Sequence, residues 1–213
     1  MTTIRDEIAN ALGDPTVSAA SDALYPCILD NAKAVDQKLN KHIVLLFIVT
    51  LIYIVLVSLG AGQIEIVGVT ISDFSIIDRI GPAAIAFLYF QVIALACARK
   101  VLESAHDAIF ETKYSKLYDM DIEMLIKPPH VLRFYTYISR RGKGIFFRVM
   151  EQSGGYMSLF LALAVPLFLL YCIFSNAMQY GLQDVIGLLS NLATIFFVSQ
   201  TAVLMVGLSK ITE

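Results

Sequence analysis

The chain of 213 residues is 57% hydrophobic and 16% charged, and its formal net charge is −2. Soluble domains carry about a quarter charged residues, so this composition excludes an ordinary soluble globular protein. The apolar residues gather in four runs that contain no charged residue, at 43–61, 80–98, 156–174 and 185–209. Since about 20 helical residues cross the hydrocarbon core of a bilayer, these runs predict four transmembrane helices.

The distribution of Lys and Arg predicts how these helices are oriented. Of the 16 basic residues, four lie in 1–42 and ten in 99–155, whereas 62–79 contains one and 175–184 contains none. Cytoplasmic segments of membrane proteins carry the excess of Lys and Arg. We therefore expect a multi-pass protein of a bacterial inner (plasma) membrane, with both termini and the 99–155 loop in the cytoplasm.

The N-terminal segment 1–42 is expected to form cytoplasmic helices. Asp14-Pro15 is typical of a helix start, because Asp can cap a helix and proline fits its first position. A further helix is expected after Pro26, from about residue 27 to 61, because no helix breaker separates this stretch from the first apolar run.

The outer connection 62–79 is rich in Ile, Val and Thr, and Gly68 lies in its middle. This composition predicts two short strands, and therefore a small extracytoplasmic β-ribbon between the first two transmembrane helices. Residues 43–98 would comprise those two helices together with the ribbon.

The second transmembrane helix is expected to begin near Gly81-Pro82 and to continue past Arg99 into a cytoplasmic loop domain at 99–155. The sequence Ser153-Gly154-Gly155 predicts a flexible joint before the third transmembrane helix. Residues 156–213 would form helices three and four with a short cytoplasmic tail. The expected fold class is an all-α membrane protein with four transmembrane helices, cytoplasmic termini, helical cytoplasmic extensions and the small β-ribbon.

A basic-aromatic segment, residues 127–150, holds six Lys or Arg and five Phe or Tyr but no Asp or Glu. Its charges and rings suit three partners: anionic lipid headgroups, a phosphate-bearing ligand such as a nucleotide or short oligonucleotide, or an acidic protein. Both a β-hairpin and an interfacial helix fit residues 131–150. The candidate binding residues are Lys127, Arg133, Tyr135, Tyr137, Arg140, Arg141, Lys143 and Arg148.

The fourth apolar run carries a polar stripe on one side of the expected helix. Its members fall within about 100° of helical arc. Small and hydroxyl residues allow membrane helices to pack closely within one chain. Several copies could instead place the stripe around a shared axis, as an oligomer interface or the lining of a narrow uncharged pore. The stripe consists of Gly187, Ser190, Asn191, Thr194 and Thr201.

The sequence contains only fragments of known metal-binding and catalytic motifs. Glu103 and His106 have the Glu-x-x-His spacing of di-iron helices, but such sites need a second pair and further carboxylates. The sequence contains neither a Gly-x-Ser-x-Gly elbow nor a phosphate-binding loop. We therefore expect no enzyme activity, no metal and no cofactor.

These patterns predict a homo-oligomeric membrane channel or membrane-permeabilising effector. Control would come from the cytoplasm, through an anionic, nucleotide-like ligand or an acidic soluble partner protein. The expected partners are membrane lipids, further copies of the chain and this ligand or protein. The alternative is a non-conducting membrane anchor or scaffold subunit that recruits a soluble cytoplasmic partner.

Overall fold

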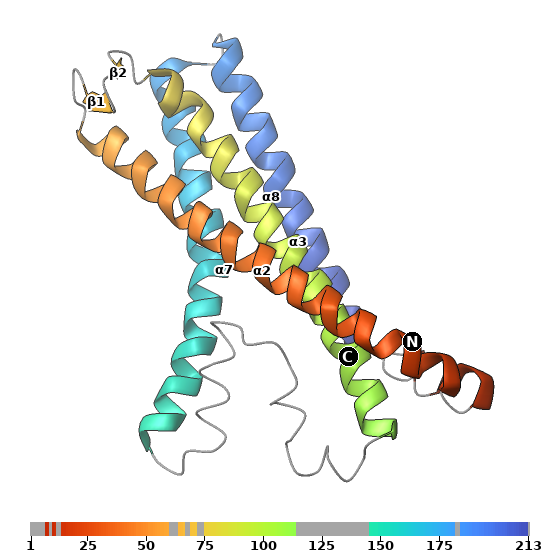
Figure 1. Cartoon of the computed structure of the whole chain (residues 1–213). Helices are drawn as coiled ribbons and strands as arrows, with labels where there is room; N and C mark the ends of the chain where they lie inside the picture. Colours follow the sequence, from red (N-terminus) through yellow and green to blue (C-terminus); the bar gives the residue numbers. More distant parts are fainter. Residues whose placement is uncertain are drawn as a thin grey trace. The chain divides into compact units, whose positions relative to one another are not determined.

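Four long helices dominate the computed structural model (Figure 1). They are α2 (Pro15–Leu59), α3 (Ser75–Lys113), α7 (Ile145–Tyr180) and α8 (Val185–Thr212). Each contains a stretch that is long and apolar enough to cross a membrane, which confirms the prediction of four candidate spans in a multi-pass protein. The structure describes residues 7–8, 10–11, 14–59, 64–66, 69–71, 75–113, 145–181 and 184–212.

The first long helix, α2, begins earlier than the expected residue 27. It starts at Pro15, directly after Asp14, as the cap-and-proline pattern predicts. Pro26 lies inside the helix and does not open a new one. An interior proline removes one backbone hydrogen bond, but its fixed φ angle is compatible with a helix. Apolar residues keep helical spacing on both sides of Pro26, and their packing outweighs the lost hydrogen bond. The predicted helix from 27 to 61 is therefore the later part of one 45-residue helix.

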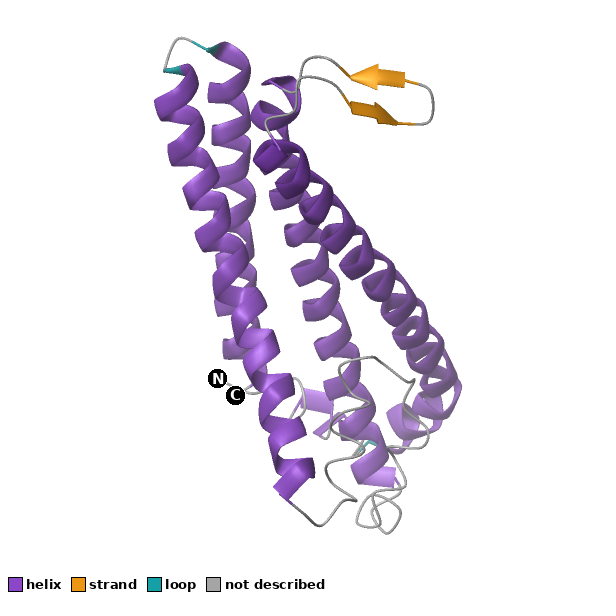
Figure 2. Cartoon of the chain, turned by 90° about the vertical axis from the view of Figure 1, so that its left-hand side faces the viewer, coloured by secondary structure: helices purple, strands orange, loops and turns teal. Residues whose placement is uncertain are grey.

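Two short strands lie in the connection between α2 and α3 (Figure 2). Strand β1 (Ile64–Ile66) pairs antiparallel with β2 (Val69–Ile71), with Ile64 opposite Ile71 and Ile66 opposite Val69. The location of this ribbon on the outer side of the membrane stays a prediction.

The helices that follow are also longer than the apolar runs. Helix α3 begins at Ser75, ahead of the expected start at Gly81-Pro82, and continues past Arg99 to Lys113, as predicted. Asp78 in its first turn and Lys113 in its last turn complement the helix dipole.

Helix α7 contains the predicted Ser153-Gly154-Gly155 joint within its 36 residues, so the expectation of a break there is wrong. Its neighbours are strong helix formers such as Met and Glu, and they outweigh the small cost of two glycines. Residues 145–150 are helical as well, which disfavours a returning hairpin strand there. Residues 131–144 lie outside the described part of the chain.

The chain divides into two compact units. Unit 1 comprises 1–41, 93–158 and 203–213, and unit 2 comprises 42–92 and 159–202. The buried apolar residues of unit 1 include Leu39, Ala108, Ile109 and Phe110. Those of unit 2 include Leu46, Leu56, Ile85, Ala86 and Leu169.

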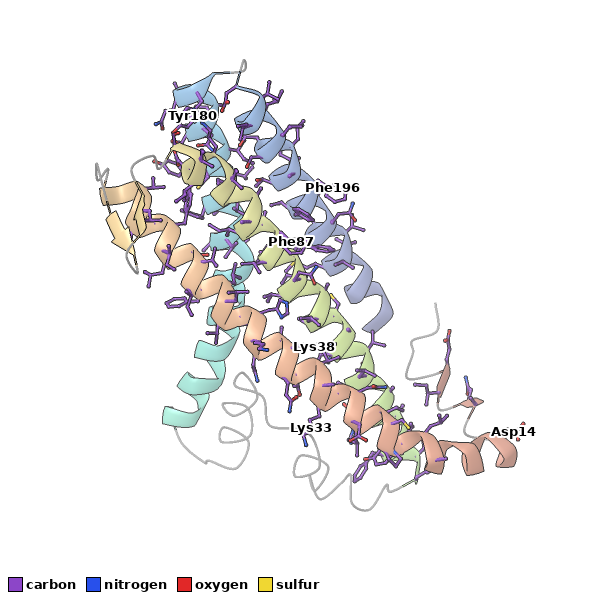
Figure 3. The ribbon with its side chains drawn as sticks, turned by 45° about the horizontal axis from the view of Figure 1, so that its top comes forward. Asp14, Lys33, Lys38, Phe87, Tyr180 and Phe196 are labelled. Atoms are coloured by element: carbon purple, nitrogen blue, oxygen red, sulfur yellow. The ribbon has the colours of Figure 1, made fainter. Side chains whose placement is uncertain are left out.

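The outer surface of unit 2 is apolar, as a lipid-facing surface requires. Phe47, Leu167 and Leu189 are each more than half exposed, and such residues would be unusual in number on a soluble monomer. Between α3 and α8, the rings of Phe87 and Phe90 lie 5.3 and 5.8 Å from the ring of Phe197, with Phe87 at the surface. Figure 3 labels Phe87 and Phe196, the sequence neighbour of Phe197.

Candidate functional site

The predicted binding residues of the basic-aromatic segment fall almost entirely outside the described part of the chain. Arg148 lies in helix α7, four positions into its 36 residues, and its side chain is not described. The structure therefore neither gathers these residues into a site nor separates them. The residues outside the description are Lys127, Arg133, Tyr135, Tyr137, Arg140, Arg141 and Lys143.

Within unit 2, a polar network surrounds Asp78 in the first turn of α3. The Tyr53 hydroxyl of α2 donates to Asp78 Oδ1 at 3.1 Å, and the Tyr180 hydroxyl of α7 donates to Oδ2 at 2.9 Å. Asn176 Nδ2 of α7 donates to the Asp78 backbone carbonyl at 3.3 Å. One carboxylate therefore receives hydroxyl donors from two helices while it belongs to a third. Tyr180, at the C-terminal end of α7, is labelled in Figure 3.

An ion pair brings the fourth helix to the same network. Arg79 Nη1 donates to Asp184 Oδ1 at 3.4 Å, and Nε lies 3.3 Å from Oδ2 as an ion-pair contact rather than an aligned hydrogen bond. The Arg79 guanidinium also lies over the Tyr180 ring, with its carbon 4.5 Å from the ring centroid. We call Tyr53, Asp78, Arg79, Asn176, Tyr180 and Asp184 the Asp78 network.

Asp184 has a second role, because it caps α8. Its Oδ2 accepts a hydrogen bond from the Gly187 backbone N–H at 3.0 Å, and its carbonyl accepts one from Leu188 N at 2.9 Å. This is the geometry of an N-cap, which satisfies backbone donors at the start of a helix. The same carboxylate therefore contacts Arg79 and fixes the start of α8.

Close packing aims the Tyr53 hydroxyl at Asp78. Tyr53 is 6% exposed, and its ring meets Phe168 edge-on at 6.1 Å between centroids. Gly81 lies directly against the same ring, so that a Cβ at this position would overlap the ring atoms Cδ2 and Cε2 of Tyr53. Phe168 and the absent side chain at Gly81 together define where the ring can lie.

The predicted polar stripe of α8 is largely buried inside unit 2. Thr194 is fully buried and Thr201 is 3% exposed, and their hydroxyls donate to the carbonyls of Ser190 and Phe197, both at 2.8 Å. Gly187 and Ser190 are buried and Asn191 is half-buried. Burial within one chain is the packing arrangement that we considered beside a pore or an oligomer interface.

Two side-chain oxygens of this stripe are buried but form no hydrogen bond with the described residues. Ser190 Oγ and Asn191 Oδ1 are inaccessible to solvent and have no hydrogen-bond partner among the described residues. They lie on neighbouring positions of a helix that is apolar enough to span a membrane. Hydrocarbon offers such atoms no alternative partner.

A second cluster of polar residues lies in unit 1. Asp36 of α2 forms an ion pair with Arg99 of α3, with 2.6 Å between Oδ1 and Nε, and the Asp36 side chain is 6% exposed. Tyr25 Oη lies 2.9 Å from His106 Nε2, and His106 Nδ1 lies 3.2 Å from Asp107 Oδ1. The His106 ring also stacks on Phe110 at 5.8 Å. These contacts attach the part of α2 before the first apolar run to α3.

This cluster also bears on the Glu103–His106 spacing. Both ring nitrogens of His106 already have partners, Tyr25 and Asp107. The described residues contain no group of three or more His, Cys, Asp or Glu that could hold a metal ion. The buried histidine therefore contributes to packing between two helices.

Sequence reasoning missed the Asp78 network. The sequence places Asp78 and Arg79 only at the end of the 62–79 connection, and Asp184 only at the end of the 175–184 turn. A usable signal was present, because ionisable or aromatic polar residues flank the neighbouring ends of three apolar runs. What the pattern could not show was which of these residues meet.

Comparison of the chain with protein-family models, with curated proteins and with solved structures finds no match.

Proposed function

We propose that this chain forms a homo-oligomeric membrane channel or membrane-permeabilising effector in a bacterial inner (plasma) membrane. A cytoplasmic anionic, nucleotide-like ligand or an acidic partner protein would control it. The observation that carries this proposal is the pair of buried acceptors on α8, Ser190 Oγ and Asn191 Oδ1, which have no hydrogen-bond partner among the described residues.

Unpaired polar atoms are costly inside a bilayer, because hydrocarbon cannot hydrogen-bond to them. Since no donor among the described residues reaches these atoms, the partner we propose is water that enters the bundle or a donor on another copy of the chain. Polar side chains on membrane helices commonly associate in this way. Both sources of a partner agree with an oligomer that encloses a narrow, uncharged path.

The continuity of the helices supports control from the cytoplasmic side. Helix α7 begins at Ile145, inside the basic-aromatic segment, and the same helix ends at Tyr180 in the Asp78 network. Helix α3 likewise includes both Asp78 and the residues Arg99 and His106, which contact α2. A ligand or partner that moved the basic-aromatic segment would act on a helix that also contributes to the Asp78 network.

One observation favours the alternative, a non-conducting anchor or scaffold subunit. Thr194 and Thr201 are buried, and each hydroxyl has a backbone acceptor within its own helix. Helix packing within a single chain accounts for both residues without an oligomer. In that case the basic-aromatic segment would recruit a soluble partner protein.

Ion flux from liposomes that contain the purified protein distinguishes the two functions. We expect flux with the wild-type chain, and a reduced flux or a changed oligomer size with Asn191→Leu and Ser190→Ala. Ser199→Ala is the matched control, because Ser199 is exposed on α8 and its hydroxyl already donates to the Phe196 carbonyl. A protein that stays monomeric and conducts nothing under any ligand condition supports the anchor.

The ligand is tested separately, by titration of the protein with mononucleotides, cyclic nucleotides and short oligonucleotides at two salt concentrations. We expect saturable binding that weakens with salt and is lost when Arg140, Arg141 and Lys143 are all changed to Gln. Each lost phosphate contact should also flatten the salt dependence. Binding that the triple variant retains would contradict the assignment of the ligand to this segment.

A further inference from the structure

We propose that the Asp78 network is a latch that holds the ends of all four long helices together in the resting state of the protein. The inference rests on the proposed function, because it assigns the closed state of a channel or permeabilising effector to this set of contacts. The contacts come from Tyr53 on α2, from Asp78 and Arg79 on α3, from Asn176 and Tyr180 on α7, and from Asp184 before α8.

The first argument is the way in which the Asp78 carboxylate is shared. Its two oxygens receive donors from different helices, Oδ1 from Tyr53 and Oδ2 from Tyr180. Neither donor belongs to the helix that carries the carboxylate. A movement of α2 or of α7 relative to α3 therefore breaks one of these bonds at once.

The second argument is that these contacts can be exchanged for water. The side chains of Arg79 and Asp184 are 24% and 17% exposed, and Tyr180 is half-buried. Asp78, Arg79, Tyr180 and Asp184 lie at the ends of the apolar stretches, so water can replace their partners when the helices separate. Tyr53 and Asn176 are 6% and 3% exposed, so their contacts open after those of the other four residues. The apolar contacts of the unit 2 core offer no such exchange, because their separation exposes hydrocarbon surface. Polar contacts of this kind suit an element that has to open and close.

The third argument connects the latch to the narrow, uncharged path that we propose for the oligomer. Asp184 both pairs with Arg79 and caps α8, so release of Arg79 frees the residue that fixes the start of α8. Ser190 and Asn191 follow Asp184 by six and seven residues, about two helical turns. Opening of the latch would therefore displace the start of α8, the end of this helix that lies closer to Ser190 and Asn191, whose buried oxygens have no hydrogen-bond partner among the described residues.

The chain supplies its own reporter for latch opening. Cys172 is buried, with 4% of its surface exposed, and lies on the same helix as Asn176 and Tyr180. A chain with Cys27→Ser and Cys97→Ala retains Cys172 as its single thiol. The rate at which a small water-soluble thiol reagent modifies Cys172 then measures how often water reaches the interior near the latch, whether or not the protein conducts ions.

Each test variant in this background removes one latch contact and is paired with a control elsewhere. The Tyr53 hydroxyl also hydrogen-bonds to Cys172, so Tyr53→Phe changes the surroundings of the thiol directly, and Tyr180→Phe and Arg79→Gln are the decisive variants. Tyr53→Phe and Tyr180→Phe each delete one hydroxyl, and Tyr171→Phe deletes the hydroxyl of an exposed tyrosine on α7. Gly81→Ala places a methyl group against the Tyr53 ring, whereas Gly207→Ala places one where no atom lies within 4 Å. Arg79→Gln removes the charge that pairs with Asp184.

We expect each latch variant to raise the rate of Cys172 modification about tenfold, the size expected when a hydrogen bond to a charged group is lost. Tyr171→Phe and Gly207→Ala should leave the rate unchanged. Because Gly81→Ala acts by moving the Tyr53 hydroxyl away from Asp78, adding Tyr53→Phe to it should have little further effect. The helical content of each variant is measured first by circular dichroism, which separates opening of the latch from unfolding. If a packing variant such as Gly81→Ala loses helix, Arg79→Gln tests the latch in its place.

The outcomes for the latch and for the proposed function are distinct. Unchanged Cys172 rates in all latch variants overturn the latch, and so do equal increases in the two controls. Raised rates without ion flux from liposomes in any variant retain the latch and overturn the channel. Flux from wild-type protein together with unchanged Cys172 rates retains the channel and overturns the latch.

Discussion

Two carboxylates at helix contacts, the buried Asp36 and the half-buried Asp78, are matched by partners from other helices. Asp36 is 4% exposed and meets Arg99, while Asp78 receives two phenol hydroxyls. A carboxylate that leaves water needs such donors, because its desolvation is costly. The two carboxylates differ in what satisfies them: a full positive charge for Asp36, and neutral donors for Asp78.

This difference predicts a large cost when the partner of Asp36 is removed. We expect Arg99→Gln to destabilise the protein by about 3 kcal/mol, because it leaves a buried carboxylate without its counter-charge. Lys33→Gln, an exposed position on the same helix, should change stability by less than about 0.5 kcal/mol. Thermal unfolding of both variants in one detergent is the measurement.

The partner substitution completes the comparison. Asp36→Asn combined with Arg99→Gln should recover part of the loss, because the double variant no longer buries an unpaired charge. Equal unfolding temperatures for Arg99→Gln and Lys33→Gln would show that the ion pair contributes nothing to stability.

At the scale of elements, the length and charge of the apolar runs were enough to predict the four long helices. The start of α2 after Asp14 also followed from its cap and proline. The interruptions were predicted wrongly: helix α2 continues through Pro26, and α7 continues through Ser153-Gly154-Gly155. Prolines and glycines impose local costs of about 1–3 kcal/mol, and a long helix with strong neighbours tolerates them.

The capping role of Asp184 leads to a prediction about α8. Asp184→Asn retains an oxygen that can accept from Gly187 N–H but removes the charge that pairs with Arg79, whereas Asp184→Ala removes both interactions. We expect the Ala variant to be less stable than the Asn variant by about 1 kcal/mol, the usual value of a helix cap. The first turn of α8 should also exchange its amide hydrogens faster in the Ala variant.

Amide exchange at Gly187 and Leu188, followed by mass spectrometry, measures this effect directly. The exposed Met178→Ala substitution, near the end of α7, serves as the control and should leave exchange in α8 unchanged. Identical exchange in the Asn and Ala variants would mean that the carboxylate does not cap the helix.

At the scale of the whole molecule, the sequence predicted the number of spans but not the contacts between them. Asp78 and Tyr180 were visible as polar residues near the ends of apolar runs, whereas Tyr53 lies in the middle of the run 43–61 and carried no such signal. Whether these residues contact one another depends on which side of each helix faces its neighbours. The helix interfaces mix small, aromatic and hydroxyl residues, so the sequence has no strong helical periodicity that identifies the buried side. The polar stripe of α8 was the exception, because its buried members share one side of a single helix.

The orientation of the four helices in the membrane is the last prediction, and it depends on the ten basic residues in 99–155. In intact bacterial cells, a membrane-impermeant thiol reagent should label Gln63→Cys and Gln183→Cys in a cysteine-free background. Ser139→Cys should be labelled only after the cells are permeabilised, because the Lys- and Arg-rich loop is retained in the cytoplasm. Permeabilised cells, in which all three variants should react, control for intrinsic reactivity. Labelling of Ser139→Cys in intact cells would place the basic-aromatic segment outside, and control by a cytoplasmic ligand or partner would then be ruled out.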